Sequence, residues 1–129
     1  MKVEIDKHSG FCGGVIRAIK TAENFLTEHP GENLFSLGAI VHNDAELDRL
    51  RDMGLTTIDY DDLGQTTDAA GHTLLIRAHG EPQLTYMRAD AAGFSVIDCT
   101  CPVVLELQKN IREAYERICR EDIGGQIII

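Results

Sequence analysis

The feature that most constrains the fold of this chain is a regular alternation of short apolar runs with amphipathic segments. Apolar residues recur at helical spacing from Val15 to Leu26, and the sequence His29-Pro30-Gly31 ends that pattern. Strands are expected at residues 2–6, 34–37, 55–60, 73–78, 94–98 and 126–129. Strands that alternate with helices are typical of parallel sheets. The sequence therefore predicts an α/β fold, a parallel sheet with helices on both faces.

Turn and capping residues predict where the intervening helices begin and end. Asn43 is a candidate N-cap, with Glu46 at the third helical position, and Gly54 follows the end of that helix. Another helix is expected to start near Pro82 and to end at Gly93. Residues 61–71 are polar and predict a loop.

A long helix is predicted from Pro102. Its expected buried face consists of Val103, Val104, Leu107, Ile111, Ala114, Tyr115 and Ile118. Cys119 adjoins that face and is expected to point into the core.

Composition excludes several classes of partner. The net charge of −9 argues against non-specific binding to nucleic acid or to acidic membranes. No apolar run reaches membrane-spanning length, and the N-terminus does not resemble a signal peptide. The four cysteines form neither a CxxC pair nor a dense disulfide framework. We expect a cytoplasmic protein in a reducing compartment.

Cys12 lies in the run Gly10-Phe11-Cys12-Gly13-Gly14-Val15, where a strand is expected to give way to a helix. A thiol at a helix N-terminus meets free backbone N–H groups and the positive end of the helix dipole, which favours the thiolate. A lone cysteine is as often a small buried residue. Paired glycines at a helix start are costly, however, unless something approaches the backbone closely.

Four candidate functional residues follow predicted strands: Cys12, His42, His79 and Cys101. Ligands of open parallel sheets bind beyond the carboxyl ends of the strands, so these side chains are expected at one edge. Taken singly, an isolated histidine is more often an ordinary loop residue. Cys99 lies two residues before Cys101, so both thiols are expected on the same face of the strand. The other histidines are expected at the surface: His8, His29 and His72.

Four motifs follow one another along the chain: Gly10-Phe11-Cys12-Gly13-Gly14-Val15-Ile16-Arg17-Ala18-Ile19, Ile40-Val41-His42-Asn43, Ala78-His79-Gly80 and Asp98-Cys99-Thr100-Cys101-Pro102-Val103-Val104. In this order they resemble the motifs of the IspH (LytB) family of 4-hydroxy-3-methylbut-2-enyl diphosphate reductases. The resemblance runs from Met1 to Ile129. It departs at Gly13, where alanine is more common, and at Arg77, where a smaller residue is usual.

The resemblance implies an iron–sulfur enzyme of isoprenoid biosynthesis. Its 4Fe–4S cluster is held by three cysteines, which leaves one iron free for the substrate hydroxyl. Cys12 and Cys101 match two of these ligands, while Cys99 takes a position that is usually alanine. His42 and His79 match residues that hold the substrate diphosphate. The implied reaction converts an allylic diphosphate to isopentenyl and dimethylallyl diphosphate, with electrons from a donor such as ferredoxin or flavodoxin.

The resemblance also implies a particular domain organisation. The family chain is more than twice as long and forms three related α/β domains around the cluster. Residues 1–101 are therefore expected to form the first domain, with residues 1–12 as a candidate strand of the third domain's sheet. Residues 102–129 are expected to be the first helix and strand of the second. The third cysteine and the proton donor are expected downstream, so the chain is expected to be inactive alone and to self-associate through unpaired strands.

Two other functions remain open on the residues alone. Cys12, Cys101, His42 and His79 could form a Cys₂His₂ zinc site, which would make the chain a zinc-binding α/β module. Cys99 and Cys101 could exchange between dithiol and disulfide, although a bridge across a single intervening strand residue is strained.

Overall fold

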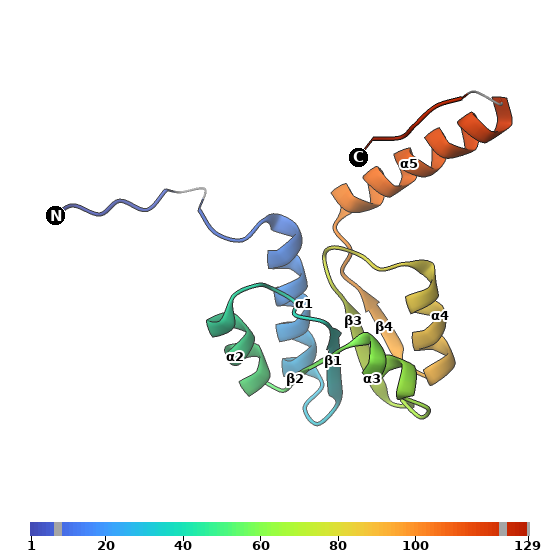
Figure 1. Ribbon diagram of the computed structural model, residues 1–129. Helices are drawn as coiled ribbons and strands as arrows, with labels where there is room; N and C mark the ends of the chain where they lie inside the picture. Colours follow the sequence, from blue (N-terminus) through green and yellow to red (C-terminus); the bar gives the residue numbers. More distant parts are fainter. Residues whose placement is uncertain (7–8, 122–123, 129) are drawn as a thin grey trace.

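The computed structural model describes residues 1–6, 9–121 and 124–128 (Figure 1). Its four strands are β1 (Asn33–Leu37), β2 (Leu55–Ile58), β3 (His72–Ile76) and β4 (Ser95–Asp98). They form one sheet in the order β2-β1-β3-β4, and every neighbouring pair is parallel. The helices are α1 (Gly13–Glu28), α2 (Asp44–Asp52), α3 (Tyr60–Gln65), α4 (Gln83–Ala92) and α5 (Pro102–Glu121). The predicted parallel α/β architecture is confirmed.

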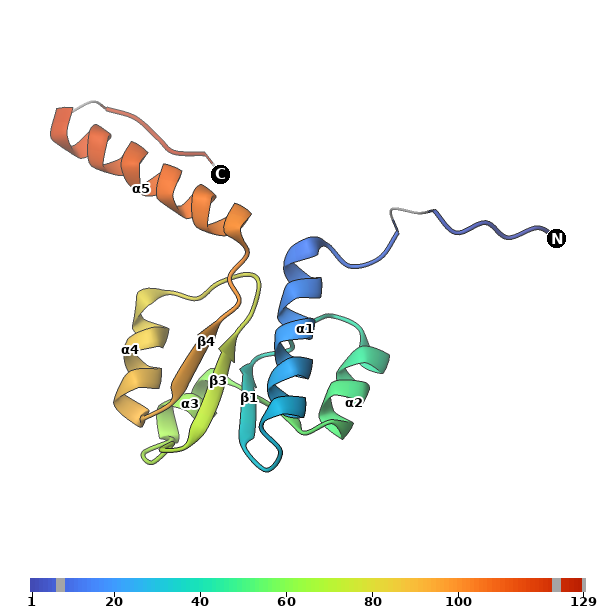
Figure 2. The ribbon, with the colours of Figure 1, turned by 180° about the vertical axis from the view of Figure 1, so that it is seen from behind.

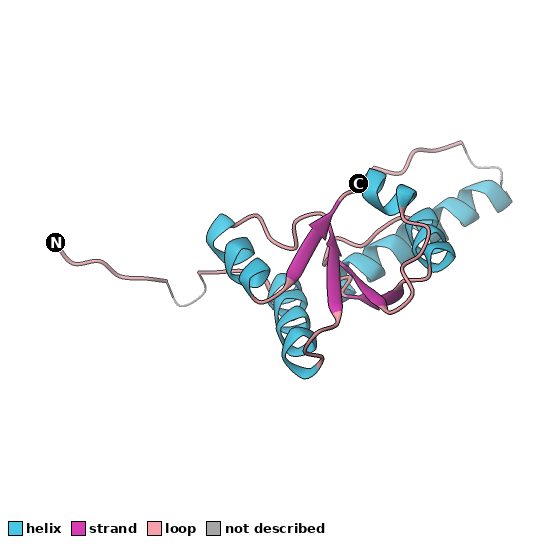
Figure 3. Cartoon of the chain, turned by 90° about the horizontal axis from the view of Figure 1, so that it is seen from below, coloured by secondary structure: helices cyan, strands magenta, loops and turns pink. Residues whose placement is uncertain are grey.

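Helices cover both faces of the sheet, as Figure 3 shows from below. Buried side chains of α1 and α2 pack with Leu34 and Leu75 on one face. Those of α3 and α4 pack with Leu37 and Leu74 on the other. Successive strand residues point to opposite faces, so Leu74 and Leu75 belong to different layers of the core. The central strands β1 and β3 are therefore buried on both sides, as is typical of parallel sheets, whereas most residues of the edge strands β2 and β4 are exposed.

The strand order creates a division at the carboxyl edge of the sheet. β1 and β3 are neighbours, but the chain leaves β1 toward α2 on one face and leaves β3 toward α4 on the other. The connections that follow two such strands separate, and a crevice between them is where open α/β sheets bind ligands. α1 runs into the start of β1 (Figure 2), so its N-terminus lies at this same edge.

Most predicted helix boundaries are confirmed. The side chain of Asn43 accepts a hydrogen bond from the Glu46 backbone N–H, with 3.0 Å between the two atoms. α4 begins directly after Pro82 and ends before Gly93. α5 begins at Pro102.

The prediction of a polar loop at residues 61–71 is wrong for residues 61–65, which belong to α3. The Asp59 side chain accepts hydrogen bonds from the N–H groups of Asp61 and Asp62, and the Asp62 side chain accepts one from the Asp59 N–H. This reciprocal capping box satisfies the free donors of the first turn. Leu63 is buried against the sheet and anchors the helix. A six-residue helix with one apolar anchor shows too little periodicity to be recognised in the sequence.

The predicted terminal strands are absent from the described residues. Residues 1–6 and 124–128 have no regular secondary structure, and Ile129 lies outside the described part. Neither segment has a strand partner in the described sheet, and an isolated strand cannot satisfy its backbone groups. The tail instead runs back along α5, where Gly125 lies close to Ile118 (Figures 1 and 2).

The predicted buried face of α5 is also not buried. The helix projects away from the sheet (Figure 1) and contains no buried residue. Val103 is 75% exposed and Tyr115 61% exposed, and Cys119, expected in the core, is exposed. The tail lies close to this face, where Gly125 approaches Ile118. None of the helices in the described part of the chain combines the length and apolarity needed to cross a bilayer.

Candidate functional site

Cys12 is the N-cap of α1, as its position in the sequence predicted. Its backbone is extended and its side chain makes no capping hydrogen bond, so the thiol is not used to terminate the helix. The residue is exposed, and the N-terminus of α1 that it caps lies at the carboxyl edge of the sheet (Figure 2). The fold thus presents a free thiol at a helix N-terminus.

Cys101 is half-buried where β4 leads into α5, and its N–H donates to the Ala78 carbonyl over 2.9 Å. A Cβ atom on Gly14 would lie 3.0 Å from both Cβ and Sγ of Cys101 and 3.6 Å from Cβ of Ala78. The glycine therefore lets the first turn of α1, which Cys12 caps, approach Cys101 closely. This contact accounts for a glycine at position 14, whereas Gly13 faces open space.

His42 and His79 follow β1 and β3, the strands on either side of the division in the sheet. Their ring centroids are 6.4 Å apart, with the ring planes tilted by 43°. Both residues are exposed at the edge that also carries the cysteines. Two imidazoles at this separation could contact one small polyanion between them.

A hydrogen-bond network links α1 to the residues around Cys101. Arg17 donates to the Thr100 carbonyl over 2.6 Å, so the helix capped by Cys12 is tied to the residue before Cys101. Asp98 accepts from the backbone N–H and the hydroxyl of Thr100, at 2.8 and 2.5 Å. Its other oxygen accepts from the Tyr86 hydroxyl of α4 at 3.0 Å. This network orients the Asp98–Cys101 segment.

The environment of Asp98 favours its ionised form. Partial burial alone would raise the pKa of this carboxyl, but the hydrogen bonds from Thr100 and Tyr86 and the charge of Arg17 outweigh it. The pKa of Asp98 is therefore lowered from its usual value. An ionised acceptor strengthens both hydrogen bonds from Thr100.

Cys99 differs from Cys101 despite lying only two residues away. It is 2% exposed and packs in the apolar cluster with Ala18 and Ile19 of α1. Burial raises the pKa of the Cys99 thiol. All four cysteines are free thiols in this structure. A buried, protonated thiol is a poor partner for disulfide exchange, so the structure gives no support to a Cys99–Cys101 redox pair.

The remaining sequence-predicted residues lie apart from this edge. His29 and His72 are half-buried rather than fully exposed: His29 stacks on Phe25 with ring centroids 4.5 Å apart, and the Nδ1 atom of His72 lies 3.1 Å from the side-chain nitrogen of Asn33. His8 lies outside the described residues.

No third metal ligand joins the two cysteines within the part of the chain that the structure describes. No group of three or more His, Cys, Asp or Glu side chains is placed there to hold a metal ion. The Cys₂His₂ zinc alternative requires four donors in one coordination sphere, and they are not assembled in this way. The chain itself offers two thiols and a separate histidine pair.

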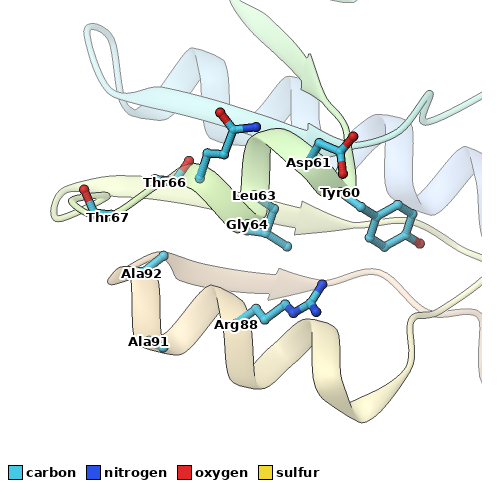
Figure 4. A pocket seen from close by; sticks show the side chains of 10 residues that line it. Tyr60, Asp61, Leu63, Gly64, Thr66, Thr67, Arg88, Ala91 and Ala92 are labelled. Atoms are coloured by element: carbon cyan, nitrogen blue, oxygen red, sulfur yellow. The ribbon is translucent and has the colours of Figure 1, made fainter.

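A pocket elsewhere on the molecule lies between α3 and α4 and is lined by Tyr60, Asp61, Leu63, Arg88 and their neighbours (Figure 4). None of the four site residues lines it. The carboxyl edge of the sheet therefore remains the candidate site.

Sequence reasoning did not single out Arg17, Asp98 and Thr100 as site residues. All three lie within the segments that carry the motifs of Cys12 and Cys101. Their closeness in sequence to Cys12 and Cys101 was one signal. The network itself joins Arg17 to Thr100, 83 positions away, and only the folded structure reveals it.

Comparison with known proteins gives consistent matches along the chain. The family model described as LytB protein matches residues 3–126. A Bacteroides fragilis protein named 4-hydroxy-3-methylbut-2-enyl diphosphate reductase is 46% identical over 129 residues, which make up 100% of this chain and 42% of that protein. The Bacteroides thetaiotaomicron protein of the same name is 50% identical over 117 residues, 91% of this chain and 39% of that protein. The chain thus spans less than half the length of these curated relatives.

Solved structures of the same enzyme are similar in fold. One structure of (E)-4-hydroxy-3-methyl-but-2-enyl diphosphate reductase, the terminal enzyme of the non-mevalonate pathway, matches with a TM-score of 0.67 and 38% identity, over 89% of this chain and 37% of that one. The Plasmodium falciparum E-1-hydroxy-2-methyl-but-2-enyl-4-diphosphate reductase matches with a TM-score of 0.70 and 31% identity, over 86% of this chain and 33% of that one.

Proposed function

This chain belongs to the LytB protein family, as its motifs predicted, and on that premise we propose that it forms part of the site of a 4-hydroxy-3-methylbut-2-enyl diphosphate reductase. The proposed reaction is the reductive dehydroxylation of the allylic diphosphate to isopentenyl and dimethylallyl diphosphate. It breaks a C–O bond, consumes two electrons and two protons, and releases water. A ferredoxin or a flavodoxin is the proposed class of electron donor.

The observation that carries this proposal is that two contacts, Gly14 with Cys101 and His42 with His79, form at the carboxyl edge of the sheet. The turn of α1 that Cys12 caps lies against Cys101 through Gly14, and His42 lies beside His79 across the division of the sheet. Thiols and imidazoles suit different ligands. Two neighbouring functions, metal binding and anion binding, are therefore supported at the same edge.

The cysteines fit a partial set of ligands for an iron–sulfur cluster. Iron–sulfur clusters are held by cysteine thiolates, and both thiols are free and unused by the fold. When bound, a 4Fe–4S cluster would supply the electrons that the reduction consumes. We assign Cys12 and Cys101 as two ligands and exclude Cys99, since it is buried in the core. With no third ligand placed among the described residues, we propose that one comes from outside these 129 residues.

The two histidines are proposed to hold the substrate diphosphate. The chain is acidic overall, so an anionic group needs a local cluster of hydrogen-bond donors. His42 and His79 provide ring N–H donors from the two connections that flank the division of the sheet. Their place at the edge that carries the cysteines would set the hydroxyl end of a short substrate toward the metal ligands.

The family also supports the proposed domain division. We assign residues 1–101 to one α/β domain and residues 102–129 to the start of another, since α5 projects from the sheet and packs on none of its helices in Figure 1. Within the first of these, residues 1–12 are a candidate segment of a further domain's sheet. The exposed apolar residues of both ends favour association with another polypeptide.

The cluster assignment is tested by anaerobic reconstitution of the chain with iron and sulfide. We expect thiolate-to-iron absorption and acid-labile sulfide in the unsubstituted chain, and their loss in Cys12→Ser and Cys101→Ser. Cys119→Ser is the matched control, because Cys119 is an exposed thiol on α5. Full iron and sulfide in Cys12→Ser, or equal loss in Cys119→Ser, contradicts the assignment.

The anion assignment is tested with inorganic pyrophosphate by titration calorimetry. His42→Ala and His79→Ala should each weaken binding on the order of tenfold, which corresponds to loss of about 1.4 kcal/mol. His72→Ala is the control, because His72 begins β3 at the opposite end of the strand from His79. The two substitutions should leave the iron absorption unchanged. Weaker binding in His72→Ala alone contradicts the assignment.

A further inference from the structure

We propose that Arg77 and Glu81 are positioning residues that hold the His42 and His79 loops at their observed separation. The inference rests on the proposed function of the two histidines. It is carried by a buried ion pair that connects three neighbouring strand ends.

Glu81 is the centre of this arrangement. Its side chain is only 2% exposed. One oxygen, Oε1, lies 3.3 Å from Nη2 of Arg77, while Oε2 accepts from the Tyr60 hydroxyl at 2.5 Å and from the Thr85 hydroxyl at 3.5 Å. The hydrogen bond to this carboxylate raises the pKa of Tyr60, which keeps the phenol protonated as a donor. Buried carboxylates of this kind require partners, and Glu81 takes them from different elements.

Arg77 extends the contact to the connection that follows β1. Its Nη1 atom lies 3.5 Å from the Ala39 carbonyl oxygen. The guanidinium also packs over Gly38, where a Cβ atom would lie 2.7 Å from Nη1, and Gly38 has a φ of +71°. Any side chain at position 38 would therefore displace the guanidinium and strain the backbone.

The pair joins the segments that carry the two histidines. Ala39 lies three residues before His42, and Glu81 lies two residues after His79. Tyr60, which also bonds to Glu81, lies just after β2. The contacts of Arg77 and Glu81 therefore link the carboxyl ends of β2, β1 and β3, which are consecutive in the sheet. The two histidine-bearing loops diverge toward opposite faces after this point. The contacts of Arg77 and Glu81 join the two loops where they leave the sheet, and are thus well placed to set the distance between the histidine rings.

Stability alone does not account for the pair. Arg77 makes a single long contact to the carboxylate, and its Nε atom is buried without a hydrogen-bond partner. A buried ion pair with such incomplete hydrogen bonding is weak evidence for stabilisation, because desolvation offsets the attraction. Buried ionic groups serve in some proteins to specify one conformation, and that is the role assigned here.

The test uses the chain with the double substitution Arg77→Met/Glu81→Gln, which removes both charges and so leaves neither buried alone. Arg77→Lys is the conservative variant, because a single ammonium can face Glu81 but cannot also reach Ala39. Arg51→Met is the matched control, since Arg51 forms an exposed ion pair with Asp48 on α2. Circular dichroism confirms that each variant is folded.

Two readouts are measured on each variant: the nuclear Overhauser effect between the ring protons of His42 and His79, and the Kd for inorganic pyrophosphate. In the double variant we expect the ring contact to be lost and Kd to rise on the order of tenfold. In Arg77→Lys we expect a weakened ring contact at near-normal stability, and no change in Arg51→Met. A folded double variant with an unchanged ring contact overturns the proposal.

The two readouts separate this inference from the proposed function. If the unsubstituted chain shows the ring contact but binds no pyrophosphate, the anion-binding role of the histidines fails, while loss of the contact in the double variant still supports positioning. If pyrophosphate binds and the ring contact survives every substitution, positioning fails and the proposed function stands.

Discussion

Cys12, Cys99, Cys101 and Cys119 share one side-chain chemistry but have different environments. Cys12 and Cys119 are exposed, Cys101 is half-buried and Cys99 is enclosed by the core. Sequence analysis separated Cys99 from Cys101 only through the family register, because both follow the same strand. Depth of burial distinguishes them physically: Cys99 lies inside the apolar cluster with Ala18 and Ile19, whereas Cys101 is half-buried beside Gly14.

Alkylation rates should follow this difference in exposure. With iodoacetamide under reducing conditions, we expect Cys12 and Cys119 to react first and Cys99 last, by at least about tenfold, because burial both blocks access to its thiol and raises its pKa. Peptide mass spectrometry over time measures each site. A Cys99 that reacts as fast as Cys119 would show that the α1 layer opens readily or that the packing is wrong.

The carboxylate of Asp98 orients the segment that carries Cys101 by accepting hydrogen bonds from Thr100. Asp98→Asn should lower the free energy of unfolding by ~1 kcal/mol near neutral pH, because the variant loses charge-assisted hydrogen bonds from Thr100 at a partly exposed position. Since the pKa of Asp98 is lowered in the folded chain, its stabilisation is complete above about pH 4 and is lost as pH falls below that.

Urea unfolding of both proteins across this pH range measures the effect. The difference between them should shrink on acidification. Asp90→Asn, an exposed substitution on α4, serves as the control and should show no such trend. A difference that grows as pH falls would contradict the hydrogen-bond assignment.

At the scale of elements, one glycine at the start of α1 allows this helix to approach Cys101 closely. Gly13 and Gly14 are adjacent in the same first turn, yet only Gly14 lies against Cys101. The sequence indicated that paired glycines needed a close approach to justify their cost. Only the docking of α1 on the sheet reveals which of the two is needed.

Alanine substitutions should separate the two glycines. Gly13→Ala should be neutral or stabilising by up to ~1 kcal/mol, because alanine favours helix and meets open space. Gly14→Ala should destabilise by about 1 kcal/mol, because a clash of roughly 1–3 kcal/mol exceeds the gain in helix propensity. Thermal or urea unfolding of the pair measures this. Equal effects at both positions would show that Cys101 does not pack on α1 as described.

At the scale of the whole molecule, the described chain has a buried α/β layer structure and a long helix outside it. Side chains of β1 and β3 are buried on both faces, whereas α5 contains no buried residue. Apolar positions on α5 match the periodicity of a core helix, but none of them is buried. The amphipathic pattern correctly predicted the helix and wrongly predicted its burial.

Hydrogen exchange should reveal this difference in local stability. Backbone amides of β1 and β3 should be the most protected, and those of α5 should exchange faster by at least about a hundredfold, because tertiary packing supplies most helical stability. Exchange followed by mass spectrometry at several dilutions is the measurement. Protection of α5 equal to that of β3 at low concentration would contradict the exposed helix, while protection that rises with concentration would support self-association.

Much of this protein was determined by its sequence alone. Periodicity, Asn43, Gly93 and Pro102 predicted most elements, and four polar residues after expected strands, one of which does not form in the described residues, indicated the site edge. These signals act within a few residues of one another, so the chain displays them locally. Tertiary structure alone decided the strand order that places His42 beside His79, the burial of Cys99 and the exposure of α5. It also decided the contacts of Arg77 and Glu81. Each depends on surfaces brought together from distant parts of the chain, and no local pattern encodes which surfaces will meet.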